Sequence, residues 1–431
     1  MTAVSPVSPG TVLDPVDRAE LQRRTLRALT AGQIVGAAAL ACAVTVGAFV
    51  IQDMLGQNTP WAGTATAVVT MGTALMAQVL SRRMQRRGRR PGLVLGYGAA
   101  AVGGVVAAVG VETGALALFV VGLFVFGNGQ AANLLARYAA TDLAEPDQRG
   151  RAMSRIVFAS TFGAVFGPLM IGPTEHAAEE WFGLDRYTGP WLFSAIFFVG
   201  ASLNTAIRLR PDPLVAAGGT IAAGTGKRPL ELGATLRVIS RHPQARLAVT
   251  AMVISQVTMV AVMAMTPVHL KLHGHEGLSQ YVVSLHIAGM YAFSPLVGRY
   301  SDRRGRTRAI SIGAVLLIAA TSMSALSGDA ELLLFPSLWL LGLGWNFGLI
   351  GGSSLLVESV PSGQRVAVQG VADLAMSFCG GLAGFSSGFI RRAVGFHILS
   401  TMAMIAAGLL LGAAVRAVMT SRTRPVELAS R

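Results

Sequence analysis

Two pairs of soft ligand residues lie four positions apart in neighbouring apolar segments. Met259 and Met263 form the first pair, and His286 and Met290 form the second. Residues four apart share one face of an α-helix, so each pair would place two ligands in one stripe. Thioether sulfur and neutral imidazole suit Cu(I) better than Mg²⁺, Mn²⁺ or Ca²⁺, which prefer oxygen. The spacing therefore predicts a copper site built by two neighbouring helices.

Further candidate ligands surround these pairs. Met252 precedes Met259 by seven residues, and Cys42 falls opposite Met259 when the two halves of the chain are aligned as a repeat. Three histidines in the predicted outer loop could collect metal: His269, His273 and His275. An imidazole must be neutral to bind metal, so copper uptake is expected to weaken at acidic pH. The alternative is that the methionines fill gaps in a core and that the loop histidines are solvated.

The composition indicates what must position these residues. The chain has 431 residues, of which 52% are hydrophobic and 13% are charged, whereas soluble proteins carry about 25% charged residues. Charges gather between about twelve apolar runs, each long enough to cross a hydrocarbon core of roughly 30 Å as a helix. We therefore predict an all-α polytopic membrane protein with twelve transmembrane helices in two pseudo-symmetric six-helix halves.

The expected boundaries follow the apolar runs and the basic loops. The predicted parts are a cytoplasmic N-terminal tail (1–28), a six-helix half (29–208), a central cytoplasmic linker (209–246), a second six-helix half (247–419) and a cytoplasmic tail (420–431). The second half is expected to carry helices near 247–268, 281–297, 309–326, 332–352, 368–390 and 396–419. Lys and Arg concentrate on cytoplasmic loops, which explains the net charge of +14 without a nucleic-acid partner.

The two halves repeat one another at their basic loops. Gly88 corresponds to Gly305, and Asp142 corresponds to Glu358 with an offset one residue shorter. Two six-helix halves around a central loop are typical of internally duplicated transporters that bind substrate at the membrane midplane.

One loop resembles a signature of the major facilitator superfamily. The stretch from Gly298 to Arg306 resembles that family's Gly-x-x-x-Asp-Arg-x-Gly-Arg motif through Gly298, Asp302, Arg303, Gly305 and Arg306. The resemblance implies the fold of the family, secondary transport by alternating access, and a conformational gate on the cytoplasmic side in which Asp302 pairs with an Arg or a helix N-terminus. The first-half copy departs from the motif, with Ser81 in place of Gly and Gln85 in place of Asp.

The Met/His pairs resemble those of the CcoA-like (CalT) copper importers of the same superfamily, which carry these motifs on helices 7 and 8. The resemblance implies copper uptake into the cytoplasm, with copper as transported substrate and no permanently bound cofactor. This chain has only Cys42 and Cys379, whereas members of that group carry further cysteines.

The alternative function is proton-coupled efflux of small organic compounds. Gly163-x-x-x-Gly167-Pro168 partly resembles the antiporter motif of the superfamily, although small residues also permit close helix packing. Asp373 is a candidate coupling residue, placed near the membrane interface about two turns into its helix, and no second buried acid accompanies it. The sequence shows no phosphate-binding motif and no nucleophile–His–acid set, so an enzyme is not predicted. The expected location is a bacterial-type cytoplasmic membrane, with the lipid bilayer and a small solute as partners of a monomer.

Overall fold

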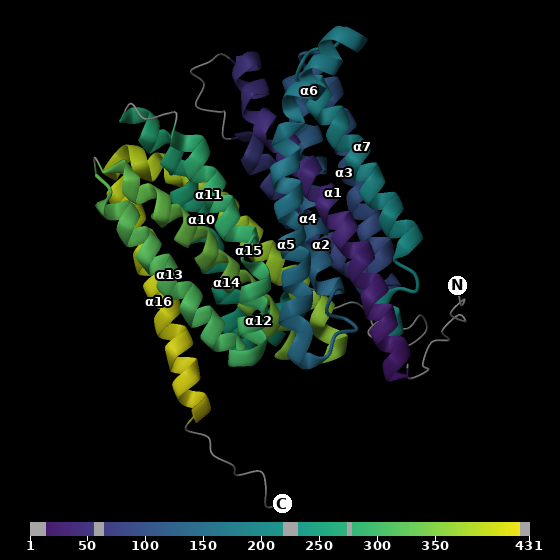
Figure 1. Cartoon of the computed structure of the whole chain (residues 1–431), viewed down its shortest axis with the longest axis vertical. Coiled ribbons are helices and arrows are strands. Elements are labelled where there is room, and N and C mark those ends of the chain that lie inside the picture. The colour runs from purple at the N-terminus through teal and green to yellow at the C-terminus, as the bar shows by residue number, and fades with distance from the viewer. Residues whose placement is uncertain (1–13, 56–63, 219–231, 274–277, 329, 423–431) are drawn as a thin grey trace, which may run out of the picture. The chain divides into compact units, whose positions relative to one another are not determined.

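The computed structural model describes residues 14–55, 64–218, 232–273, 278–328 and 330–422 and is helical, with no strand among these residues. The first part of the chain forms α1 (Pro15–Leu55), α2 (Thr64–Arg87), α3 (Arg89–Glu112), α4 (Leu116–Ala139), α5 (Arg149–Leu169), α6 (Ile171–His176), α7 (Thr188–Arg208) and α8 (Pro213–Ala216) (Figure 1). The rest forms α9 (Leu232–Arg241), α10 (Pro243–Leu272), α11 (Ser279–Tyr291), α12 (Ser294–Arg304), α13 (Arg306–Leu326), α14 (Leu334–Glu358), α15 (Ser362–Val394) and α16 (Phe396–Arg422).

Within the described ranges, twelve segments are long and apolar enough to cross a membrane. Large apolar side chains on their outer faces are exposed, including Val102 on α3, Ile196 on α7 and Leu409 on α16. Water disfavours such surface, whereas lipid does not. The predicted twelve-helix, all-α class is therefore confirmed.

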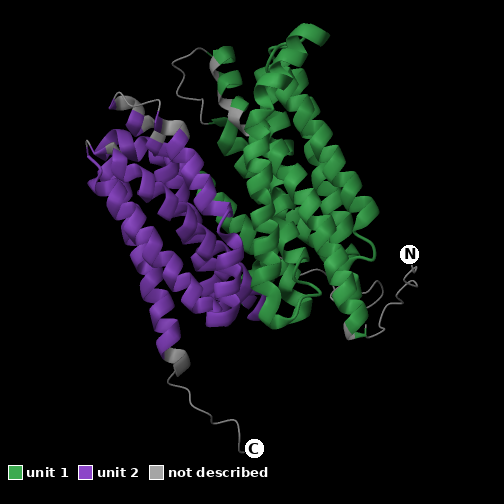
Figure 2. Cartoon of the chain, in the orientation of Figure 1, with its two compact units in different colours: residues 1–237, 361–381 green, residues 238–360, 382–431 purple. Residues whose placement is uncertain are grey.

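The chain divides into two compact units (Figure 2). Unit 1 contains residues 1–237 and 361–381, and unit 2 contains 238–360 and 382–431. The predicted halves were divided by the sequence repeat, whereas these units are divided by their internal contacts. The two divisions differ at α15, whose first part belongs to the same unit as α1 to α7.

Close helix approaches build unit 1. Gly163 and Gly167 of α5 lie against backbone atoms of α1, where an added Cβ would overlap them. The glycine spacing noted in the sequence therefore has a packing role. Trp191 anchors the core between Phe119 and Phe126, with ring centroids 5.3 and 5.2 Å away.

The helix α14 is the centre of unit 2, because α10, α11 and α13 all pack on it. Glycines again permit the contact: a Cβ at Gly342 of α14 would overlap the carbonyl oxygen of His286, and one at Gly289 of α11 would overlap that of Trp339.

Several predicted boundaries shift. Residues predicted to form a tail are helical from Pro15, and α15 begins at Ser362 rather than near 368. The helix predicted over 281–297 is two helices, α11 and α12, which are separated by Ala292 and Phe293. Because Pro295 lacks an N–H and fits the first turn of a helix, it favours a new start at Ser294.

Candidate functional site

The break between α11 and α12 faces α14. Ser294 and Asn346 are both fully buried there. The Asn346 amide donates to Ser294 Oγ at 3.0 Å, and the Ser294 hydroxyl lies 3.3 Å from Asn346 Oδ1. Irregular backbone within a membrane protein is tolerated where protein covers it or where it lines a cavity, and broken helices mark transporter binding sites. The break therefore indicates a candidate substrate-binding site in unit 2.

His286 presents a hydrogen-bond acceptor in the same unit. Its ring is fully buried, and Nδ1 lies 2.8 Å from the carbonyl oxygen of Leu338. A carbonyl only accepts, so Nδ1 carries the proton and donates it. Nε2 then keeps a lone pair, and this atom has no hydrogen-bond partner in the structure. His286 can therefore accept a hydrogen bond from a solute or bind a soft metal ion.

Aromatic rings lie beside these polar groups. The Trp345 indole Nε1 donates to Gln256 Oε1 of α10 at 2.7 Å, and Tyr291 meets the Trp345 ring edge-on at 6.0 Å. Phe293 at the break packs on Trp339 at 5.6 Å. We define the unit 2 cluster as the side chains that lie on, or pack against, two turns of α14. They are Gln256, His286, Tyr291, Phe293, Ser294, Trp339, Trp345 and Asn346.

The unit 2 cluster combines neutral polar groups with aromatic faces. Nearby on α10, the Ser255 and Thr258 hydroxyls are also buried without a hydrogen-bond partner. Buried polar groups are normally paired, and these two hydroxyls can pair with water or with a solute. The arrangement suits a neutral solute that has both a ring and hydrogen-bonding groups.

The predicted copper ligands are placed as follows. Met259 is buried and Met263 is half-buried on α10, while Met290 is half-buried on α11. Among the described residues, no three His, Cys, Asp or Glu side chains gather as a metal site. A copper site would therefore consist of thioethers around the imidazole of His286.

The additional candidate ligands lie elsewhere or have other partners. The sulfur of Met252 accepts the Ser353 hydroxyl at 3.8 Å, which fixes this methionine against α14. Cys42 is buried in unit 1 with its sulfur 4.0 Å from the Pro190 carbonyl oxygen.

The loop histidines are not all in a loop. His269 lies within α10, where it is buried and stacks on Phe396 at 4.5 Å, so the alternative of a solvated loop histidine does not hold for it. His273 directly follows that helix, with its ring 4.2 Å from that of His269. His275 is outside the described residues.

The predicted gate motif is built around Arg306. Gly305 separates α12 from α13 with a φ of 97°, a value that favours glycine. The Arg306 guanidinium pairs with Asp302 and donates to Glu358 Oε1 at 2.9 Å. Gly298 is buried and Arg303 is exposed. The predicted pairing of Asp302 with an arginine is therefore present.

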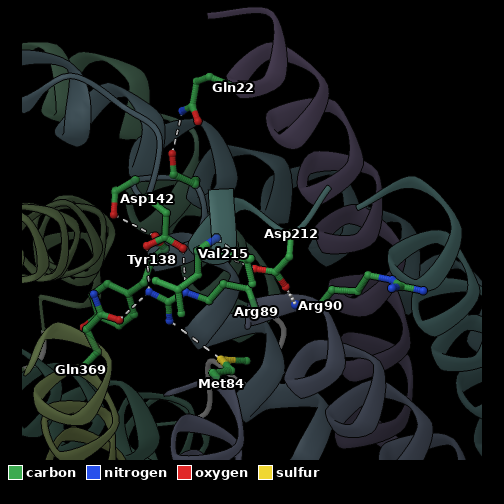
Figure 3. A network of polar contacts seen from close by, with 12 residues as sticks. Gln22, Met84, Arg89, Arg90, Tyr138, Asp142, Asp212, Val215 and Gln369 are labelled. Atoms are coloured by element: carbon green, nitrogen blue, oxygen red, sulfur yellow. Dashed lines mark hydrogen bonds and ion pairs between the residues drawn. The ribbon is translucent and has the colours of Figure 1, made fainter. Parts of the chain in front are cut away.

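The first-half copy of this loop forms a related network, in which Gln85 stands at the position equivalent to Asp302 (Figure 3). Gly88 has a φ of 90°, and Arg89 holds Asp142 through two hydrogen bonds of 2.8 and 3.0 Å. Arg89 also donates to Gln369 of α15 at 2.9 Å. Burial raises the pKa of Asp142, and the Arg89 guanidinium opposes that rise.

The candidate coupling residue Asp373 is packed inside the protein. It is fully buried and pairs with Arg137 of α4 at 2.5 Å. Arg137 lies inside α4, which continues to Ala139. The sequence signal for it was an arginine directly after an apolar run. No feature of the sequence indicated its partner, 236 residues away.

Comparison with known proteins identifies the family to which this architecture belongs. The model of the Major Facilitator Superfamily matches residues 29–385. The chain belongs to the major facilitator superfamily. It is therefore a multi-pass membrane protein of a secondary transporter family.

Two relatives within the superfamily match most of the chain. The chain is 38% identical over 409 residues to the uncharacterized transporter YdeG of Bacillus subtilis, covering 93% of each chain. It is 28% identical over 383 residues to the riboflavin transporter RfnT of Brucella anthropi, covering 88% of this chain and 92% of that protein.

Solved structures show the same fold. The human organic anion transporter MFSD10 matches with a TM-score of 0.75 at 16% identity, covering 91% of this chain and 99% of that one. A bacterial homologue of the iron transporter ferroportin, in its outward-facing state, matches with a TM-score of 0.68 at 14% identity, covering 92% and 99%.

Proposed function

We propose that this superfamily member transports a neutral organic solute that combines an aromatic ring with hydroxyl or amide groups, of the riboflavin class. The observation that carries the proposal is the unit 2 cluster. Its indole and phenol rings can stack on a planar ring, which favours binding by offset or edge-on contacts. The lone pair of His286 Nε2 can accept a hydroxyl or N–H of the solute.

Riboflavin fits this chemistry, because its planar ring system carries a polyhydroxy chain and no net charge. The relative RfnT, whose length the chain nearly spans, is a riboflavin transporter. The cluster residues have no net charge when His286 is neutral, so a neutral solute enters without an unpaired charge in the membrane.

Uptake of radiolabelled riboflavin into proteoliposomes tests the proposal. We expect saturable uptake by the natural protein, and a loss of about tenfold or more for Trp345→Leu, the size expected when one aromatic contact worth about 1.4 kcal/mol is removed. Trp181→Leu is the matched control, because that tryptophan is 73% exposed and outside the unit 2 cluster. Uptake no faster than that of empty liposomes would reject riboflavin as substrate.

Copper uptake is a second candidate, favoured by one observation. The tautomer of His286 leaves Nε2 deprotonated within a buried setting, as a metal ligand requires. This hypothesis rests on Met259, Met263, His286 and Met290 alone, since the relatives named above are uncharacterized or transport riboflavin.

Met263→Leu separates the two candidates, because leucine keeps the volume and removes the sulfur. If copper is the substrate, Cu(I) uptake in proteoliposomes falls in Met263→Leu but not in Met402→Leu, a change at an exposed methionine of α16. Riboflavin uptake is expected to be equal in both variants. Absence of Cu(I) uptake by the natural protein would end the copper hypothesis.

A further inference from the structure

The short helix α9 lies between two membrane-spanning segments and belongs to neither. The spans on its two sides are Thr188–Ala216 and Pro243–Thr266. One residue, His242, separates the last residue of α9, Arg241, from the first residue of α10. Because α10 enters the hydrocarbon core, the C-terminal end of α9 must lie at the membrane surface.

Hydrogen bonds fix the joint between α9 and α10. The backbone N–H of His242 donates to the Ile239 carbonyl oxygen at 3.3 Å, and that of Arg246 donates to the His242 carbonyl oxygen at 3.0 Å. The His242 ring places Nδ1 2.8 Å from the Val238 carbonyl oxygen. Since a carbonyl only accepts, Nδ1 donates this bond. The joint therefore holds the end of α9 close to the start of the span.

The side chains of α9 separate into two faces. Leu232, Leu236 and Ile239 follow the i, i+4, i+7 spacing of one apolar face. Ile239 is buried, whereas Leu232 and Leu236 are 39% and 49% exposed. Arg237 and Arg241, four residues apart, share a second face and are exposed. The apolar face is therefore covered at Ile239 and exposed along its leucine edge, which we define as Leu232 and Leu236.

The charge around α9 has one sign. Residues 232–275 contain no Asp or Glu, and Arg241 and Arg246 are exposed on the two sides of the joint. The positive-inside rule places this linker on the cytoplasmic side, where the leaflet carries anionic lipids and a negative surface potential. A basic amphipathic helix with exposed leucines suits the plane of such an interface. Charge complementarity therefore favours a lipid surface as its partner.

We propose that α9 is an interfacial helix that binds anionic phospholipid. The leucine edge enters the boundary between headgroups and acyl chains, and the guanidinium groups of Arg241 and Arg246 bind lipid phosphates. The planar fork of arginine can hold a phosphate through two parallel hydrogen bonds. A zwitterionic headgroup also has a phosphate but carries its own cation, so the net attraction is smaller. The protein therefore selects anionic lipids at this surface.

A fluorescent label on the leucine edge tests this contact. In the full-length protein with Cys42→Ala and Cys379→Ser, Leu236→Cys carries a bimane group, and the protein is placed in phosphatidylcholine nanodiscs. Phosphatidylglycerol or phosphatidylcholine with a spin label in the upper acyl chain is the lipid quencher, and iodide is the aqueous quencher. The reference position is Gln148→Cys, which is exposed and outside α9.

We expect stronger quenching of the Leu236 label by spin-labelled phosphatidylglycerol than by spin-labelled phosphatidylcholine at equal mole fraction. Each arginine at the surface can contribute up to about fivefold to this preference. The double variant Arg241→Gln, Arg246→Gln should bring the preference close to one, and 1 M salt should act in the same direction. Arg241→Lys with Arg246→Lys should keep it. Arg155→Gln, at an exposed position of α5, is the matched control and should leave it unchanged.

Quenching by both lipids no stronger than at Gln148 would overturn the proposal, because α9 would then not contact the bilayer. Equal quenching by the two lipids at low salt would show that the contact does not select anionic headgroups. A label shielded from lipid and iodide alike would mean that protein, such as a second copy of this chain, covers the leucine edge. An effect of Arg155→Gln as large as that of the double variant would assign the preference to overall charge and not to α9.

Discussion

Arg306 and Arg89 occupy the same position in the two halves and bind different partners. Arg306 has two acids, Asp302 one turn before it and Glu358 at the end of α14. Arg89 has Asp142 and, in place of a second acid, the neutral Gln369. The residue equivalent to Asp302 is Gln85, whose buried amide has no hydrogen-bond partner.

The two acids around Arg306 should contribute unequally to stability. The Asp302 side chain is 1% exposed, whereas that of Glu358 is 28% exposed. Removing one partner of a buried ion pair costs about 3 kcal/mol or more, and solvent screening reduces that cost to about 1 kcal/mol or less for exposed pairs. In denaturant unfolding of the detergent-solubilised protein, Asp302→Asn should therefore lose clearly more stability than Glu358→Gln. Equal losses would show that burial does not set the strength of these pairs.

Gln369 should contribute less to stability when an acid is introduced at position 85, which is equivalent to Asp302. A hydrogen bond to a charged group contributes about 2 kcal/mol, so Gln369→Ala should destabilise the protein by about that amount. In a Gln85→Asp background, the new carboxylate stands one turn before Arg89, as Asp302 stands before Arg306. The same Gln369→Ala change should then cost less. A double-mutant cycle measures the difference, and strict additivity would contradict the shared role.

At the scale of elements, α14 determines how unit 2 is assembled. Its small residues let α11 approach within backbone contact, which places the Leu338 carbonyl oxygen beside His286 Nδ1. The same helix supplies Trp345 and Asn346 to the unit 2 cluster. Packing and site geometry therefore depend on one helix contact.

Gly342→Ala should disturb that contact. The added Cβ would meet the carbonyl oxygen of His286 and the backbone nitrogen of Met290. Overpacking of this kind typically costs about 1–3 kcal/mol, and it should weaken riboflavin uptake by moving His286. The control is Gly408→Ala on α16, where an added Cβ has nothing within 4 Å. Thermal unfolding and uptake are measured together, and a Gly342→Ala protein that matches the control in both would contradict the close approach.

At the scale of the whole molecule, the charge distribution sets the expected orientation in the membrane. Six arginines lie between Ser81 and Pro91, and basic residues follow the last span. The positive-inside rule places such segments in the cytoplasm, so we expect both termini there.

Reporter fusions test this orientation. A fluorescent protein fused after Arg431 should fluoresce, because it folds in the cytoplasm. Alkaline phosphatase fused after Thr113, between α3 and α4, should be active outside. The opposite pattern, with an active phosphatase at the C-terminus, would invert the predicted topology.

The sequence by itself determined the class of the protein, its repeat and the loop that matches the superfamily motif. Apolar runs of spanning length fix the number of helices, because backbone groups in lipid must be satisfied within each helix. The Gly305 and Arg306 loop was recognisable because its residues are neighbours in the chain, and its equivalence to Gly88 followed from a constant offset.

Only the tertiary structure decided how distant groups meet. The Trp345–Gln256 bond and the Arg137–Asp373 pair join residues whose spacing carries no periodic signal. Hydrophobicity specifies that a helix is buried in the membrane, but it does not specify which face meets which neighbour. That choice is made by close packing and by the need to pair each buried polar group.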